Sequence, residues 1–419
     1  MKQHPNLIKK ILMTNKKKIF IWTLFDFANT SFSIVVVTFV YAVYFKKVVA
    51  EGKSIGDLYW SIGTSLAMII TAIISPILGA IADYSAGKKR FLLFFTLLCI
   101  VATSSLFFVG EGEIFFGILL FVLANIGFEA GLVFYDSFLP EITEPKNFGR
   151  VSGYGFAMGY LGSLATLAII YPFIQAEMIK ESFPVAALFF LIFAIPLFVY
   201  LKDNRKIKSE KVSYLNIGIT RVWNTISNLK HYKNLAIFLL AYFFYIEGVN
   251  TIIFFSGNYA STTLKFNETE LLIFFLTVQT TAIAGSVILG IIADSIGQKK
   301  TIIITLIIWL ITVLLAYLVQ DKSGFYVVGL LAGAAMGSSQ STSRSLMSKL
   351  TPPDKKTEFF GFYSFFGKSS AIIGPLVFGF VSFISGDQRL AIFSIGIFFL
   401  IGLLILLWVN DPKVDQRSL

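Results

Sequence analysis

Four charged side chains lie inside long apolar runs of this sequence, where a charge needs a physical reason. Glu129, Glu247 and Lys368 lie near the middle of such runs, and Asp26 lies about a turn and a half inside another. At the centre of a bilayer a charged side chain costs about 2.5–3.5 kcal/mol on insertion scales. Burial favours the neutral form of a carboxyl, so such a group can bind a proton from one side and release it to the other. These residues predict proton-coupled transport.

Two of the carboxylates are followed by an asparagine on the same helical face. Asn29 lies three residues after Asp26, and Asn250 lies three residues after Glu247. We expect Lys368 to bind a substrate carboxylate, or to pair with one of the glutamates while the site is empty. The structural alternative is that these charges form fixed ion pairs that hold helices together, and the sequence leaves both interpretations open.

The sequence contains few residues that could hold a metal or form a covalent intermediate. It has one cysteine, Cys99, and two histidines, His4 and His231. Neither a Cys/His cluster with metal-ligand spacing nor a nucleophile–histidine pair is present. We therefore predict no catalytic residue, no metal and no cofactor, which disfavours an integral-membrane enzyme.

The elements that position these residues are membrane-spanning helices. Of 419 residues, 56% are hydrophobic and only 14% are charged, whereas soluble domains carry about 25% charged residues. Mean hydropathy is +0.77. The apolar residues form continuous blocks near the ~20 residues that cross a bilayer as a helix. Continuous rather than alternating apolar runs favour helices over a barrel.

Polar, glycine and proline clusters divide the chain into twelve such segments. The predicted spans are 19–45, 58–82, 91–109, 114–138, 149–174, 183–201, 234–256, 270–293, 301–319, 324–348, 358–384 and 389–409. Only one connection is long, and it separates two sets of six. The predicted organisation is an N-terminal six-helix bundle (1–201), a cytoplasmic linker (202–233) and a C-terminal six-helix bundle (234–419).

Lysine and arginine are concentrated in alternate connections. With the N-terminus inside, 26 of the 35 basic residues fall on the inner side and seven on the outer side, which predicts cytoplasmic termini. The formal charge of +11 then reflects contact with anionic lipids rather than nucleic acid. In the linker, apolar residues fall on one helical face: Leu215, Ile219, Val222, Ile226 and Leu229. They predict a helix on the inner membrane surface or a partly helical, solvated linker.

The two halves of the sequence repeat each other. Asp26-Phe-Ala-Asn29-Thr30 resembles Glu247-Gly-Val-Asn250-Thr251, and Gly79-Ala-Ile-Ala-Asp83 resembles Gly290-Ile-Ile-Ala-Asp294. Later in each half, Asp136-Ser137 falls opposite Arg344-Ser345. Repeated bundles related by an axis along the membrane normal are a transporter architecture, with the substrate between the halves.

The Gly-x-x-x-Asp pattern, with the basic Lys88-Lys89-Arg90 and Lys299-Lys300 that follow it, resembles the loop motif of the major facilitator superfamily. More specifically, the chain resembles the vacuolar amino-acid effluxer family of autophagy proteins and its bacterial relatives. The segments that carry this resemblance are Trp22–Asn29, Tyr135–Glu141, Arg150–Gly155, Glu247–Thr251, Ser341–Ser345 and Glu358–Tyr363. The resemblance implies an all-α membrane protein with twelve transmembrane helices in two six-helix bundles.

The resemblance also implies roles for particular residues. Helices 1, 4, 7 and 10 would line a central cavity. Asp83 would face the start of helix 11, and Asp294 the start of helix 5, where Arg150 could be its ionic partner. Glu358 would repel Asp83 but could pair with Lys88, Lys89 or Arg90. The residues expected to act in gating here are Asp83, Arg90, Arg150, Asp294 and Glu358.

Asp136 and Arg344 occupy equivalent places in the repeat with opposite charges. Equivalent cavity-lining positions face each other across the pseudo-two-fold axis, so we expect closure of the inner side to bring these residues together. The alternative is a partner within the same half, for example Arg150 for Asp136.

These observations predict a transporter of a bacterial inner membrane. It would move a small polar organic solute, such as an amino acid, by alternating access with proton coupling. We expect a monomer whose partners are the solute, protons and membrane lipids. The alternatives are a multidrug exporter and a membrane sensor that binds a ligand without moving it.

Overall fold

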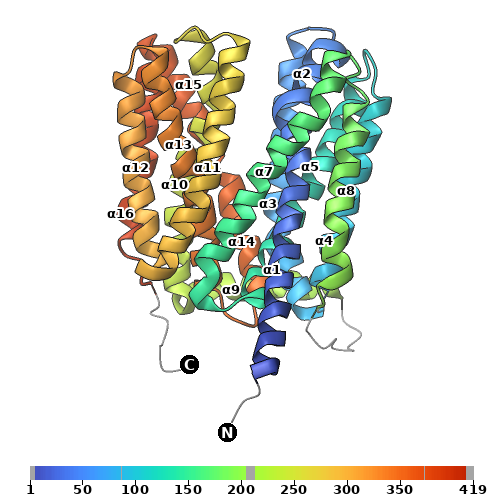
Figure 1. Cartoon of the computed structure of the whole chain (residues 1–419), viewed down its shortest axis with the longest axis vertical. Helices are drawn as coiled ribbons and strands as arrows, with labels where there is room; N and C mark the ends of the chain where they lie inside the picture. Colours follow the sequence, from blue (N-terminus) through green and yellow to red (C-terminus); the bar gives the residue numbers. More distant parts are fainter. Residues whose placement is uncertain (1–4, 86, 204–212, 372, 412–419) are drawn as a thin grey trace. The chain divides into compact units, whose positions relative to one another are not determined.

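The computed structural model describes residues 5–85, 87–203, 213–371 and 373–411, and every structural statement below concerns these residues. Their regular structure is helical throughout (Figure 1). The helices before the linker are α1 (Pro5–Phe32), η1 (Ser33–Phe39), α2 (Val40–Tyr44), η2 (Phe45–Val49), α3 (Ile55–Ser85), α4 (Lys88–Ser105), η3 (Leu106–Phe108), α5 (Ile114–Asp136), α6 (Leu139–Ile142), η4 (Pro145–Asn147), α7 (Phe148–Gln175) and α8 (Ser182–Tyr200).

The linker and the second half follow the same helical pattern. Their helices are α9 (Tyr214–Ser227), η5 (Leu229–Tyr232), α10 (Lys233–Thr262), α11 (Glu268–Ile296), α12 (Gln298–Leu318), α13 (Lys322–Leu350), α14 (Lys356–Ser370), α15 (Ile373–Ser385) and α16 (Gln388–Leu406). Residues 204–212 of the predicted linker lie outside the described residues. The α9 helix covers most of the apolar pattern that the sequence showed in this linker.

The prediction of twelve membrane-spanning segments is confirmed. Eleven described segments are long and apolar enough to cross a bilayer, and α13 is the twelfth. The α13 helix is rich in glycine, serine and threonine, and its second half is almost wholly buried. A Cβ on its Gly337 would lie 2.1 Å from the carbonyl oxygen of Ala282 in α11. Small residues let α13 pack closely against α11, so its composition reflects burial rather than exposure to lipid.

Two predicted helices are less regular than the sequence suggested. The first span runs from Asn15 to Val49 and contains the π-helical segments η1 and η2. A π-helix adds a residue to each turn and is often found at functional sites. The eleventh span is interrupted at Ala371 and continues as α15 from Ile373. The spans predicted over 19–45 and 358–384 agree with these two segments, and the sequence analysis made no prediction about their irregularities.

The chain divides into two compact units. Unit 1 contains residues 1–143, 158–222 and 354–361, and unit 2 contains residues 144–157, 223–353 and 362–419. Each unit thus holds most of one half of the sequence and a short segment of the other half. These short segments contain the starts of α7 and α14, and they carry two of the predicted gating residues, Arg150 and Glu358.

Glycines allow both of these segments to pack closely in their units. In unit 1, a Cβ on Gly361 of α14 would lie 2.5 Å from the carbonyl oxygen of Ser75 in α3. In unit 2, a Cβ on Gly153 of α7 would lie 2.2 Å from the carbonyl oxygen of Ser286 in α11. Gly153 and Gly361 are matched in the sequence repeat, so the repeat extends to the packing of the helices.

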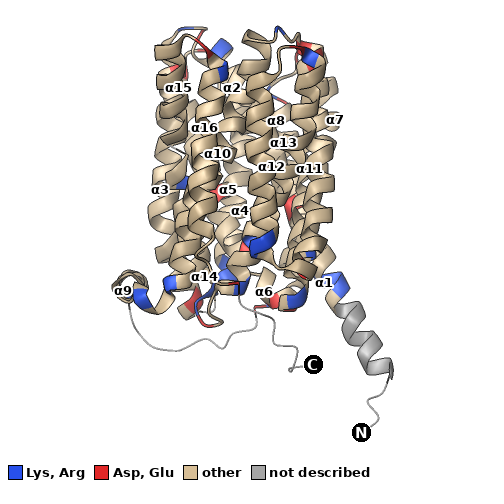
Figure 2. Ribbon diagram, turned by 90° about the vertical axis from the view of Figure 1, so that its left-hand side faces the viewer, with Lys and Arg blue, Asp and Glu red and all other residues tan. Residues whose placement is uncertain are grey.

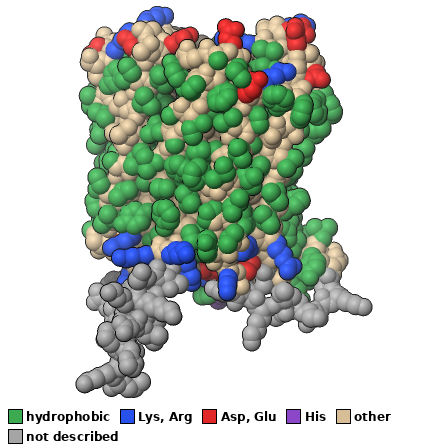
Figure 3. Space-filling model, turned by 45° about the vertical axis from the view of Figure 1, so that its right-hand side comes forward, with side chains coloured by type: hydrophobic (Ala, Val, Ile, Leu, Met, Phe, Trp, Pro, Cys, Tyr) green, Lys and Arg blue, Asp and Glu red, His purple; other side chains and the backbone are tan. Residues whose placement is uncertain are grey.

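Charged residues gather near the ends of the helices, and few lie along their length (Figure 2). On the face that Figure 3 shows, hydrophobic side chains cover the sides of the helices, and Lys and Arg follow one edge. We call this the basic end of each unit. It contains Lys88–Arg90 in unit 1 and Lys299–Lys300 in unit 2. This distribution is that of a multi-pass membrane protein.

Candidate functional site

Glu247 of α10 is fully buried in unit 2. Its Oε1 accepts a hydrogen bond from Oγ1 of Thr251, at 3.2 Å, and another from the backbone N–H of Gly374. Its Oε2 accepts no hydrogen bond of good geometry from the described residues, and the Ser370 side chain also lies near this carboxyl. One oxygen of this carboxyl is therefore held in place, while the other is available for a proton or a ligand.

The interruption of the eleventh span positions Glu247. Gly374 lies in the first turn of α15, where backbone N–H groups have no partner within the helix. A Cβ on Gly374 would overlap Oγ1 of Thr251 and Oε1 of Glu247. Only glycine lets the backbone approach the carboxyl this closely, so the fold joins the charge of Glu247 to the start of α15.

The predicted first-half residues Asp26, Asn29 and Glu129 are all buried in unit 1. Two aromatic side chains connect their helices. Nε1 of Trp22 in α1 donates to the carbonyl oxygen of Tyr135 in α5, at 3.1 Å, and the Tyr135 hydroxyl donates to the carbonyl oxygen of Trp22, at 3.0 Å. The two rings stack at 4.7 Å. This reciprocal pair holds α1 and α5 in register.

The side-chain amide of Asn29 includes a hydrogen-bond donor without a described acceptor. Its Nδ2 donates to no described acceptor, although the side chain is buried. Nearby on α1, Oγ1 of Thr30 donates to the carbonyl oxygen of Gly159 in α7, at 2.9 Å. The buried Asn29 amide thus has a donor that no described residue satisfies, which is unusual for a buried polar group.

The other two predicted binding residues are less enclosed. Asn250 of α10 and Lys368 of α14 are half-buried in unit 2, the unit that contains Glu247. The roles of all six residues in substrate or proton binding stay predictions.

Asp83, at the basic end of α3, binds the start of α14. Its Oδ2 accepts a hydrogen bond from the backbone N–H of Glu358 at 2.8 Å. A Cβ on Gly79, one turn earlier, would lie 2.3 Å from the carbonyl oxygen of Thr357. A carboxylate at a helix N-terminus is stabilised by the helix dipole. We call this contact the Asp83 clamp.

Glu358 itself is fully buried beside this clamp. Its carboxylate lies 3.5 Å from Nε of Arg221 in α9 and 3.7 Å from Nζ of Lys355. The sequence had suggested Lys88, Lys89 or Arg90 as its partner. It did not indicate Arg221, because no local pattern shows that α9 lies beside α14.

Lys88 has a different partner, Glu141 of α6. Their charged atoms are 2.8 Å apart, and Nζ of Lys88 lies 4.1 Å from the centre of the Phe138 ring. Nζ of Lys356 is 3.7 Å from the same carboxylate of Glu141. Arg90, which we predicted as a gating residue, has an exposed side chain. Lys88 rather than Arg90 is the buried cation of this motif.

Asp294, at the basic end of α11, binds the start of α7. Its carboxylate accepts hydrogen bonds from the backbone N–H groups of Gly149, at 2.7 Å, and Arg150, at 3.2 Å. Nε of Arg150 donates to Oδ2 at 2.6 Å. The Asp294 side chain is 2% exposed and that of Arg150 is 43% exposed. We call this contact the Asp294 clamp.

Arg344 of α13 also binds the start of α7. Its guanidinium donates to Oγ and to the carbonyl oxygen of Ser152, both at 2.9 Å, and lies 4.2 Å from the centre of the Phe156 ring. Oγ of Ser152 in turn donates to the carbonyl oxygen of Ser341 at 2.7 Å. The role of Arg344 in gating, and its pairing with Asp136, stay predictions.

Two aspartates that the sequence analysis did not single out cap helices at the basic ends. Oδ2 of Asp203 accepts from the backbone N–H of Lys89 at 3.1 Å, and Oδ2 of Asp411 accepts from that of Lys299 at 3.2 Å. Each aspartate follows the last helix of its half. The sequence repeat could have identified this pair. Asp203 and Asp411 are separated by the same number of residues as Asp136 and Arg344, so they occupy equivalent places in the two halves.

Comparison with known proteins supports one family. The sequence matches the model of the family described as "Vacuole effluxer Atg22 like" over residues 57–148 and 144–417. It is 35% identical over 412 residues to an uncharacterized MFS-type transporter, YxiO, of Bacillus subtilis strain 168, covering 95% of this chain and 96% of that protein. It is 24% identical over 371 residues to autophagy-related protein 22 of Kluyveromyces lactis, covering 80% and 75% of the two chains.

A solved structure shows the same fold. The proton:xylose symporter XylE, a major facilitator superfamily protein bound to 6-bromo-6-deoxy-D-glucose, superposes with a TM-score of 0.75 over 96% of this chain and 97% of its own, at 13% identity. Proteins of this superfamily are secondary transporters that bind small-molecule solutes, and they are not enzymes. The chain therefore belongs to the Atg22-like effluxer family of major facilitator transporters.

Proposed function

We propose that this protein moves a small polar organic solute across the bacterial inner membrane by alternating access, coupled to protons through Glu247. The observation that supports this proposal most strongly is the fully buried carboxyl of Glu247. Its Oε1 accepts hydrogen bonds, whereas its Oε2 accepts none of good geometry from the described residues. A charged oxygen without a partner is expensive in such a place. Binding of a proton removes that charge, so the group can exist in two states during a transport cycle.

The solute that fits these groups best carries both charges, as an amino acid does. Lys368 offers a cation for a carboxylate, and the carboxylates Asp26 and Glu129 offer acceptors for an amine. Asn29 adds a buried amide whose Nδ2 has no described acceptor. A lipophilic drug would need fewer fixed polar groups, so an amino acid or a similar zwitterion is the favoured substrate.

The two moving bodies in this proposal are the predicted bundles 1–201 and 234–419, with both termini in the cytoplasm. The Asp83 and Asp294 clamps support this idea, because each binds a helix start from the other half of the sequence. Transport would require the clamps to open and close, with Asp136, Arg150, Arg344 and Glu358 acting beside them.

The substrate can be identified with purified protein. Amino acids, peptides, sugars and organic acids would be screened for a rise in the apparent melting temperature, because a ligand that binds only the folded state stabilises it. Counterflow of each hit would then be measured in liposomes. An amino acid that both stabilises the protein and exchanges supports the proposal. Binding without counterflow would instead indicate a sensor, and exchange of lipophilic cations a drug exporter.

Glu247→Gln tests the proton coupling. The amide keeps the shape of the side chain but cannot exchange a proton, so we expect counterflow to persist while uptake driven by a pH gradient is lost. Glu268→Gln, at an exposed position in the first turn of α11, is the matched control and should retain both activities. Gradient-driven uptake by Glu247→Gln at the normal rate and with normal pH dependence would remove Glu247 from this role.

A further inference from the structure

The α9 helix has three distinct faces, and the described part of the chain covers only one of them. Gly218 and Thr225 are buried, and Arg221 between them is half-buried. A Cβ on Gly218 would lie 2.8 Å from Cγ1 of Ile81 and 3.0 Å from Cγ2 of Ile77, both in α3. This face therefore packs against the basic end of α3 in unit 1.

The second face is apolar and exposed. Leu215 is 58% exposed, Ile219 49%, Trp223 68% and Ile226 42%. These residues recur at a spacing of three or four, so they form one stripe along the helix. Tyr214 at the start of α9 and Leu229 just after it are exposed as well. A stripe of this kind, with aromatic side chains, is unfavourable in water and typical of a membrane interface.

The third face is polar and lies beside the apolar stripe, on the side away from the packed face. It consists of exposed small polar residues, namely Asn216, Thr220, Asn224 and Ser227. The surrounding sequence has no acidic residue from Lys211 to Ile246, whereas Arg221, Lys230 and Lys233 are basic. The charge of this region is thus complementary to an anionic surface.

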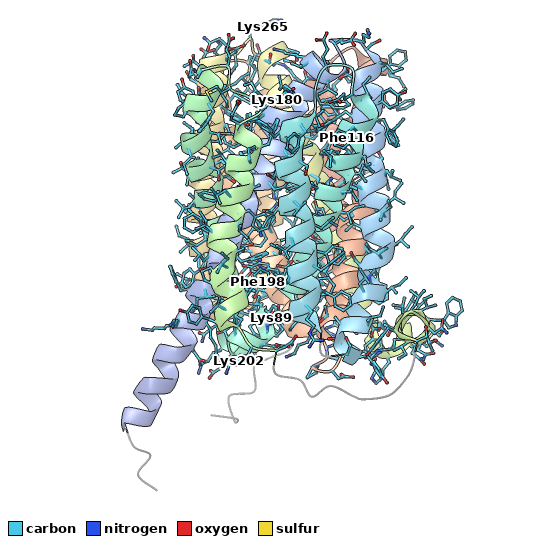
Figure 4. The ribbon with its side chains drawn as sticks, turned by 90° about the vertical axis from the view of Figure 1, so that its right-hand side faces the viewer. Lys89, Phe116, Lys180, Phe198, Lys202 and Lys265 are labelled. Atoms are coloured by element: carbon cyan, nitrogen blue, oxygen red, sulfur yellow. The ribbon has the colours of Figure 1, made fainter. Side chains whose placement is uncertain are left out.

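The position of α9 agrees with this pattern. In Figures 2 and 4 the helix is seen nearly end-on at the foot of α3, so its axis runs across the direction of that span. Figure 4 labels Lys89 and Lys202 at this basic end and Lys180 at the opposite end of unit 1. A helix here lies at the level where spans leave the hydrocarbon, with α3 on its packed side.

We propose that α9 is an interfacial helix whose stripe of Leu215, Ile219, Trp223 and Ile226 lies in an anionic lipid surface. The packed face fixes the rotation of the helix about its axis, the apolar stripe enters the headgroup region, and the polar face remains in water. Lys230 and Lys233, both exposed, contact the lipid phosphates. The α9 helix also supplies Arg221 to the buried Glu358 carboxylate, which lies beside the Asp83 clamp. The lipid surface therefore holds the counter-ion of Glu358 in place.

This inference does not depend on which solute the protein moves. It is tested on the full-length protein in a Cys99→Ser background, with single spin-labelled cysteines on each face of α9. Positions 215, 219 and 226 report on the apolar stripe. Positions 216, 220 and 224 are matched controls, because they are exposed on the same helix. Collision of each label with oxygen, which dissolves in lipid, and with a water-soluble nickel chelate would be measured in phosphatidylcholine–phosphatidylglycerol vesicles.

We expect the logarithm of the oxygen-to-nickel collision ratio to be positive at the three stripe positions and negative at the three controls. Water-like values at all six positions would overturn the proposal. Shielding of the stripe from both reagents would also overturn it, since another protein segment would then cover this face.

The charge component has its own test. The stripe labels should lie deeper in vesicles containing phosphatidylglycerol than in pure phosphatidylcholine, and Lys230→Gln with Lys233→Gln should abolish that difference. If the stripe labels lay equally deep in both lipids in the protein with both lysines intact, the anionic part of the proposal would be overturned. An unchanged melting temperature for each variant would show that the labelled proteins are folded.

Discussion

At the scale of single residues, Glu247 and Gly374 show how a carboxyl is placed in an apolar bundle. Sequence analysis indicated Glu247, because an acid inside an apolar run is conspicuous. It did not indicate Gly374, since a glycine near a proline in a span is more simply interpreted as a packing residue. The hydrogen bond between Gly374 and Glu247 forms because α15 packs against α10. Residues close together in the sequence do not reveal that contact.

Gly374→Ala should separate these two residues. The added methyl would overlap Oε1 of Glu247 and Oγ1 of Thr251, so we expect a loss of about 1–3 kcal/mol of stability, typical of overpacking, together with slower gradient-driven transport. Gly379→Ala, in the same helix with open space at its Cβ, is the control. It should be neutral or slightly stabilising. Equal melting temperatures for both variants would show that the Gly374 contact is not tight.

At the scale of elements, hydropathy and periodicity were sufficient to predict the spans but not their irregularities. The prediction of a span over 324–348 agrees with α13, although its hydropathy is low, because glycine and serine in a polytopic chain are compatible with a buried helix. The interruption at Ala371 lies four residues before Pro375, whose ring would clash with the carbonyl group of residue 371 in a continuous helix. The sequence around Ile373-Gly374-Pro375 contains the only local signal of that interruption.

The link between α9 and α14 can be tested at Arg221. Arg221→Gln removes one cation from beside the buried Glu358 carboxylate and leaves Nζ of Lys355 at 3.7 Å, so we expect a loss of about 1–3 kcal/mol of stability. Arg221→Lys should recover part of it, because the charge is kept while the planar guanidinium is lost. A melting temperature unchanged by Arg221→Gln would show that the pair, at 3.5 Å and partly exposed, contributes little.

At the scale of the whole molecule, the sequence predicts that both termini are cytoplasmic. Single cysteines at Lys53 and Glu268, in a Cys99→Ser background, should react with an impermeant reagent in intact cells, while one at Lys146 should react only after lysis. All three side chains are exposed in the structure. The neighbouring residues Gly52 and Asn267 are less suitable for cysteine substitution. The φ of 68° at Gly52 favours glycine, and Asn267 caps α11. Labelling of position 146 in intact cells would reverse the topology.

The two clamps should act on one conformational equilibrium. Each is an aspartate that binds the start of a helix from the other half of the sequence, so we expect each to stabilise a state in which the basic end is closed. Asp83→Asn and Asp294→Asn remove the charge from these contacts. Hydrogen bonds to charged groups contribute about 1.5–3 kcal/mol, so each change should shift the ratio of states about tenfold or more toward opening of the basic end. Asp294→Asn should have the larger effect, because it also loses the ion pair with Arg150.

Spin labels at positions 53 and 268 would measure this shift as the distribution of distances between the outer ends of the two halves. We expect shorter distances in each variant, and in the double variant a free-energy shift equal to the sum of the two, because both changes bias the same equilibrium. Asp57→Asn, on the exposed end of α3, is the control and should leave the distribution unchanged. If the double variant shifted no further than Asp294→Asn alone, the Asp83 clamp would be a packing contact of unit 1, and gating would rest on α7 and α11.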